Sequence, residues 1–160
     1  MAKISEWWET AGDWLLFANL VDFDMLFGHR RDVAGYARAL AEFDTWLGGF
    51  LLAIARDDLV ILTADHGNDP TFSGTDHTRE QVPLFEFHGG RSHNLGLRET
   101  FADVAAPLAD YFGLPRGWAT GTSVLPARVT LNAYPYGDRK EARRCRNERR
   151  GDRVPGPELH

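Results

Sequence analysis

Cysteine is almost absent from this chain of 160 residues, and Cys145 has no second cysteine with which to form an internal disulfide. This excludes a disulfide-stapled scaffold and favours a reducing compartment, the cytoplasm. Long apolar runs are also lacking, since none approaches the roughly 18 residues that span a bilayer. The amino terminus has Glu6, Glu9 and Asp13 where a secretory signal needs a continuous apolar region. We therefore expect a cytoplasmic protein with no membrane partner.

What is present is the composition of an ordinary globular protein, with 43% hydrophobic and 26% charged residues. A chain of this length has room for one domain with a real core. We therefore expect one compact unit.

The charge is unevenly distributed along the chain. Residues 128–160 contain nine Lys or Arg against five Asp or Glu, a balance of +4, which leaves −9 on residues 1–127. The run RKEARRCRNERR could be a nucleic-acid-binding arm. Its few apolar residues, and the Pro and Gly after it, instead favour a disordered tail and no nucleic-acid partner. We divide the chain into a lead-in (1–13), a core (14–127) and a basic, disordered tail (128–160).

The first half of the core has the pattern of a strand, a helix and a second strand. Residues 14–22 are short and almost wholly apolar, as parallel strands covered on both faces are. Asp32 is placed to cap a helix in which apolar residues recur every three or four positions over 33–54, and Asp57 and Asp58 are expected to end it. Residues 59–63 form the next apolar run. This order predicts a right-handed crossover and an α/β fold, with a mostly parallel sheet flanked by helices.

The second half of the core begins with a loop and ends with a helix. Residues 67–81 are rich in Gly, Pro, Asp and Thr, which is typical of a functional loop. Residues 82–87 predict a third strand, with Pro83 near its start. Thr100 and Asp103 have the spacing of a capping box for a helix that Gly113 ends. Pro107 is expected to kink that helix.

Five potential metal ligands follow the two predicted strands that precede the loop. Asp24 and His29 lie in a predicted loop, 24–31, after the first strand. Asp65 and His66 follow the second strand, and His77 comes eleven residues after His66. Carboxylate and imidazole without thiolate suit manganese, magnesium, iron or zinc. Ligands in open α/β sheets collect at the carboxyl ends of strands, where these residues lie. Together the five predict a metal site.

Each of these residues also has a simpler explanation when taken alone. His29 and His77 could be surface histidines, and Asp24 a turn residue. Asp65 followed by His66 at a strand end could be a local cap. Arg30 and Arg31 could attract phosphate or pair with Asp32, and the sequence favours neither. Four residues next to His77 could orient the metal ligands or simply form a surface turn: Thr75, Asp76, Thr78 and Arg79. The remaining histidines are expected to be exposed polar residues; they are His88, His93 and His160.

Three strings together resemble the carboxy-terminal core of phosphopentomutases, two-manganese enzymes of the alkaline phosphatase superfamily. These strings are NLVDFDMLFGHRRDVAGYARAL, LVILTADHGNDPTFSGTDHTREQVPL and LRETFAD. The resemblance covers residues 14–125 and implies a partial alkaline-phosphatase-like core. It implies that one Mn²⁺ is bound by Asp24, His29 and His77 and another by Asp65 and His66. Two metals about 3.5–4 Å apart can clamp the attacking and leaving oxygens in phosphoryl transfer.

The family reaction interconverts ribose or deoxyribose 1-phosphate and 5-phosphate, in nucleoside and deoxyribose catabolism. Its members also have amino-terminal strands bearing another Asp ligand, a threonine nucleophile and a cap domain, which have no counterpart here. Thr63, Thr75 and Thr78 do not match the nucleophile's context, so the catalytic residue is unknown. We expect no mutase turnover by this chain alone. The expected partners are a sugar phosphate and a separately encoded amino-terminal half.

Two alternatives remain open at this stage. Cofactor-independent phosphoglycerate mutases carry a string similar to TADHG, so the chain could come from such an enzyme or from a related metal-dependent phosphohydrolase. It could instead be a non-catalytic metal-binding remnant, or the partner subunit of a split enzyme.

Overall fold

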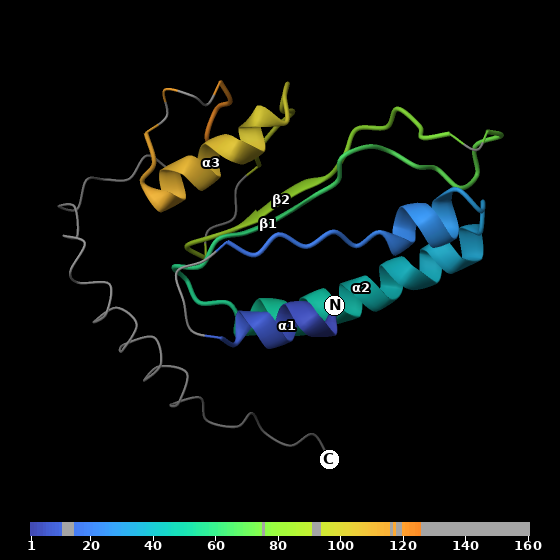
Figure 1. Ribbon diagram of the computed structural model, residues 1–160, viewed down its shortest axis with the longest axis horizontal. Helices are drawn as coiled ribbons and strands as arrows, with labels where there is room; N and C mark the ends of the chain where they lie inside the picture. Colours follow the sequence, from blue (N-terminus) through green and yellow to red (C-terminus); the bar gives the residue numbers. More distant parts are fainter. Residues whose placement is uncertain (11–14, 75, 91–93, 116, 118–119, 126–160) are drawn as a thin grey trace, which may run out of the picture.

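The computed structural model describes residues 1–10, 15–74, 76–90, 94–115, 117 and 120–125 (Figure 1). The predicted tail, 128–160, lies outside these residues. Figure 1 shows two strands with helices α1 and α2 on one side and helix α3 on the other. This arrangement is mixed α/β, as predicted. Among the described residues, no helix is both long and apolar enough to cross a membrane.

Helix α2 (Val33–Ala53) is the longest element and matches the predicted helix closely. Its amino end is capped as expected, because the Asp32 carboxylate accepts a hydrogen bond of 2.8 Å from the Gly35 amide. The helix continues through Gly48 and Gly49, despite the cost of about 1 kcal/mol for each glycine relative to alanine. It ends at Ala53, before Asp57 and Asp58, which were expected to end it.

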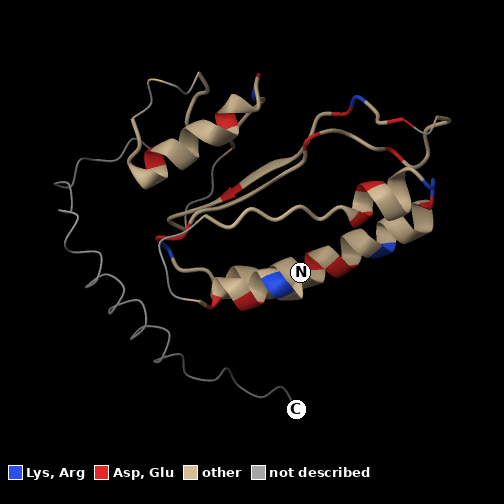
Figure 2. Cartoon of the chain, in the orientation of Figure 1, with Lys and Arg blue, Asp and Glu red and all other residues tan. Residues whose placement is uncertain are grey.

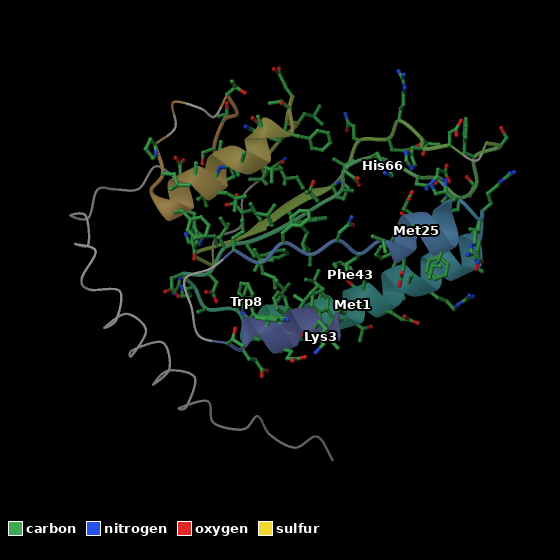
Figure 3. The ribbon with its side chains drawn as sticks, in the orientation of Figure 1. Met1, Lys3, Trp8, Met25, Phe43 and His66 are labelled. Carbon is green, nitrogen blue, oxygen red and sulfur yellow. The ribbon has the colours of Figure 1, made fainter. Side chains whose placement is uncertain are left out.

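Aromatic rings on α2 hold a short helix at its carboxyl end. Helix α1 (Ala2–Trp8) places Trp8 edge-on against Phe50, with ring centroids 5.2 Å apart. The Trp46 indole donates a hydrogen bond of 3.0 Å to the Ser5 hydroxyl. Figure 3 shows Trp8 on this packed side of α1. Each aromatic pair stabilises by about 0.5–1.5 kcal/mol beyond its buried area, so α1 belongs to the folded unit.

The sheet differs from the prediction in its direction. Strands β1 (Val60–Thr63) and β2 (Leu84–Phe87) pair antiparallel, with Val60 opposite Phe87. Both strands lie within the predicted ranges 59–63 and 82–87. A mostly parallel sheet is therefore not found in the described part of the chain, where the sheet has these two strands alone.

The missing parallel partner is the segment predicted as the first strand. Residues 15–20 run extended beside the sheet in Figure 1 but join no strand ladder. Leu15 is 62% exposed and Phe17 is 86% exposed, so a buried strand was the wrong prediction. An apolar run becomes a strand only where a neighbour pairs with its amides and carbonyls. The apolar composition of residues 15–20 predicted their extended backbone. It could not predict whether a neighbouring strand would pair with them.

Helix α3 (Ala102–Phe112) confirms the last predicted helix, with the fully buried Pro107 inside it. Gly113 ends it in the left-handed conformation at φ 67°, as expected. The predicted capping box is wrong, because the buried Asp103 carboxylate turns away to the Thr122 amide (2.7 Å) and to Arg98 Nε (2.9 Å). The Thr122 hydrogen bond, and then the Arg98 charge, lower the pKa of Asp103.

Candidate metal centre

An irregular helix carries the first two predicted ligands. Residues 24–31 were expected to form a loop, but Phe23–Gly28 forms a π-helix, η1. The His29 amide donates to the Asp24 carbonyl over 3.0 Å, a bond between residues five apart. In an α-helix two residues five apart point about 140° away from each other. The wider π turn brings Asp24 and His29 to the same side.

Three of the predicted ligands meet in one group. Asp24, His29 and His77 each offer an atom, and these atoms lie within 4.8 Å of one another. His29 Nε2 lies 3.4 Å from Asp24 Oδ2, and His77 Nε2 lies 3.4 Å from Asp24 Oδ1. Ligand atoms that share an ion at about 2.1 Å lie roughly 3.0–3.5 Å apart. The two distances from Asp24 lie in this range, and the chemistry of the three donors suits one divalent ion.

The other two predicted ligands lie beside this group but outside it. The His66 ring stacks on the His77 ring, with centroids 3.6 Å apart and planes inclined by 21°. His66 Nε2 is 3.6 Å from Asp65 Oδ2, and the Asp65 side chain is 86% exposed. Figure 3 shows His66 where the chain leaves β1, facing the end of η1 that carries Met25. All five predicted ligands thus lie at one end of the molecule.

The loop that carries His77 is folded back on itself by its own hydrogen bonds. Gly67 and Thr78 form an isolated antiparallel bridge, in which the Thr78 amide donates to the Gly67 carbonyl over 2.9 Å. The Thr78 hydroxyl accepts from the Asp69 amide at 2.8 Å. The bridge places His77 next to the residues that follow β1. Thr78 therefore supports the ligand loop from one side.

The site end of the molecule is acidic. Figure 2 shows Asp and Glu on η1 and on the loop between β1 and β2. The pKa of Tyr36 is raised, first by burial and then by the charges of Asp24 and Asp69. Two hydrogen bonds from Thr71 lower the pKa of Asp69, which favours its charged form. Negative charge collects where a cation would be held.

The remaining predicted residues have mixed outcomes. Asp32 caps α2, and its carboxylate accepts from the Gly35 amide. Arg31 has φ 57°, which is unusual for a residue with a long side chain. His88 was wrongly expected to be simply exposed, since it is partly buried with its Nδ1 2.9 Å from the Asp58 carbonyl. Asp76, Arg79 and Arg30 are exposed. Thr75, His93 and His160 lie outside the described residues.

Comparison with known proteins links these residues to a family of metal-dependent enzymes. A family model described as the metalloenzyme superfamily matches residues 1–116. The chain is 57% identical over 105 residues to a phosphopentomutase of Hahella chejuensis, an alignment covering 65% of this chain and 25% of that protein. It is 59% identical over 102 residues to a phosphopentomutase of Syntrophotalea carbinolica, covering 62% and 26%. The chain thus spans about a quarter of the length of these curated relatives.

Proposed function

The chain belongs to the metalloenzyme superfamily, and we propose that it is the metal-binding, carboxy-terminal part of a phosphopentomutase-like enzyme. One observation carries the proposal. Asp24, His29 and His77, which come from two separate segments, converge within 4.8 Å in a chain that is 57% identical over 105 residues to a phosphopentomutase. Each residue alone has a simpler explanation, but their convergence on one point does not.

We propose Mn²⁺ as the metal, held by the Asp24 carboxylate and by the Nε2 atoms of His29 and His77. Asp65 and His66 would contribute to a second metal position. When bound, such a pair of ions stabilises the charge on phosphoryl oxygens during transfer. Asp24 partly neutralises the ion, while the two imidazoles fix its position without adding charge.

The reaction we propose is the interconversion of a pentose 1-phosphate and its 5-phosphate. This chain would supply metal ligands, and the parts of such an enzyme that lie outside the matching region would supply the nucleophile and the sugar-binding cap. In such an assembly, residues 15–20 would gain the strand neighbours needed to complete a larger sheet. The alternatives are a related metal-dependent phosphohydrolase, a phosphoglycerate mutase, or a metal-binding remnant with no catalytic partner.

A chimera tests this proposal. The matching 105 residues of the Hahella chejuensis phosphopentomutase are replaced by those of this chain, and the protein is assayed with ribose 1-phosphate and Mn²⁺. Turnover to ribose 5-phosphate is expected. The same chimera carrying Asp24→Ala controls for the metal site and is expected to lose activity.

The substrates separate the alternatives from one another. Turnover of 3-phosphoglycerate or of a phosphate monoester, with none of ribose 1-phosphate, would replace the proposed reaction by one of the alternatives. A folded, metal-loaded chimera inactive on every substrate would favour the remnant.

A further inference from the structure

Asn68 is a residue near the metal ligands that no sequence pattern singled out. Its side-chain amide donates a hydrogen bond of 2.5 Å to Oδ1 of Asp24, across 44 positions of the chain. A carboxylate can only accept, so the NH₂ group of Asn68 must face it. Hydrogen bonds to charged acceptors are short and about twice as strong as neutral ones. This bond joins the loop after β1 directly to η1.

On its other side, the Asn68 amide lies against Gly28, which has no side chain to occupy that space. A Cβ atom built on the buried Gly28 would lie 2.4 Å from Asn68 Nδ2 and 2.5 Å from its Cγ. Real Cβ atoms essentially never approach so closely, so any side chain at position 28 would displace the amide. Gly28 is the last residue of η1, directly before the ligand His29. The amide thus lies between Gly28 and Asp24.

The Asp24 carboxylate needs a hydrogen-bond donor to fix its orientation, because rotation about its terminal torsion is only weakly restrained. The terminal torsion of an aspartate has a broad, roughly two-fold preference and no sharp minimum of its own. The Asp24 side chain is 31% exposed, so packing restrains it only partly. Its two oxygens are the atoms that face His29 and His77. A fixed donor on Oδ1 therefore decides how the carboxylate faces both imidazoles.

We propose that Asn68 is a positioning residue, which holds the Asp24 carboxylate in its metal-binding orientation. Gly28, which has no side chain, leaves the space that the Asn68 amide occupies. This inference rests on the proposed metal site. Asn68 follows Gly67, whose carbonyl accepts from Thr78, the neighbour of His77. The same residue thus links the helix carrying Asp24 to the base of the loop carrying His77. Its loss should disturb both ligands.

The test is calorimetric titration of the full chain with Mn²⁺. Asn68→Leu keeps the branched shape of the side chain but removes the donor, and binding is expected to weaken 10 to 100-fold, as for other groups that orient metal ligands. Asn94→Leu is its matched control, because Asn94 is exposed and its side chain accepts a hydrogen bond from the nearby Gly96 amide. That control is expected to bind Mn²⁺ like the unchanged chain.

A second pair of variants perturbs the site without touching Asn68 itself. Gly28→Ala is expected to weaken Mn²⁺ binding, because the new methyl group displaces the amide. Gly48→Ala is its control, since a Cβ at Gly48 meets nothing within 4 Å. The unfolding midpoint of each metal-free protein is measured first, to show that the variants fold.

Saturation with Co²⁺ separates positioning from simple destabilisation. A merely structural role would leave the visible absorption of the fully loaded protein unchanged, whereas a misoriented carboxylate should alter it. An unaltered spectrum, or Mn²⁺ affinity of Asn68→Leu within twofold of the unchanged chain, overturns the inference alone. Failure of the unchanged chain to bind Mn²⁺ overturns the metal site and the inference with it.

Discussion

His77→Ala is the substitution that tests the ligand group most directly. His77 supplies one of the three donor atoms, and its ring lies 3.6 Å from His66 and 4.9 Å from His29, centroid to centroid. Its side chain is 47% exposed, so its removal leaves a surface gap, not a buried cavity. The metal-free protein should therefore lose no more than about 0.5 kcal/mol of stability.

The effect on metal binding should be much larger. Removing a group that merely orients a ligand weakens a site 10 to 100-fold, so loss of a ligand itself should cost at least 100-fold, or about 2.7 kcal/mol. With free Mn²⁺ at about 100 times the original Kd, the unchanged chain gains about 2.7 kcal/mol of stability from the metal. The variant, with its Kd raised 100-fold, should gain only about 0.4 kcal/mol under the same conditions.

Denaturant unfolding with and without Mn²⁺ measures both quantities in one assay. His88→Ala is the matched control, because His88 bonds to the Asp58 carbonyl and lies outside the ligand group. It is expected to alter metal-free stability but to keep the Mn²⁺-dependent gain. If His77→Ala retained the full gain, the assignment of His77 as a ligand would be refuted.

Three further predictions concern single residues around the site and the core. Asp103→Ala should destabilise the protein by about 3 kcal/mol at neutral pH. The lowered pKa of Asp103 makes its contribution complete above about pH 4 and lost as pH falls through the folded-state pKa, so acid titrations of both proteins should converge there. Arg31→Gly should raise stability by about 0.5–1 kcal/mol in denaturant unfolding, and a loss would contradict strain at φ 57°. Asp24→Asn should lower the pKa of Tyr36, followed by tyrosinate absorbance, and no change would contradict the proposed charge coupling.

The fold was predictable where local chemistry decides it. The Asp32 cap, the apolar spacing of 33–54 and the glycine at position 113 act within a few residues, and each is found as expected. The direction of the sheet was not predictable in this way, because strand pairing depends on segments far apart in sequence. The Asp103 carboxylate failed as a cap for the same reason. Its partner, the Thr122 amide, is 19 positions away.

The candidate site was likewise predictable only where local chemistry decides it. The kinds of ligand were visible in the sequence, since carboxylate and imidazole at strand ends are chemically distinctive. The partner of Asp24 was not, because an asparagine such as Asn68 in a polar loop looks like any turn residue. A signal was nonetheless present in the spacing. Asp24 and His29 are five residues apart, which fits neither the period of an α-helix nor that of a strand.

That spacing explains why the irregular helix is needed. A regular α-helix over 23–28 would turn Asp24 and His29 to different sides and break up the ligand group. A fully flexible loop would allow the convergence but would not hold it. The π-helix fixes the two ligands on one side, and Gly28 at its end admits the Asn68 amide that reaches Asp24. The π-helix, Gly28 and the Asn68 amide thus act together to hold Asp24 and His29 in place.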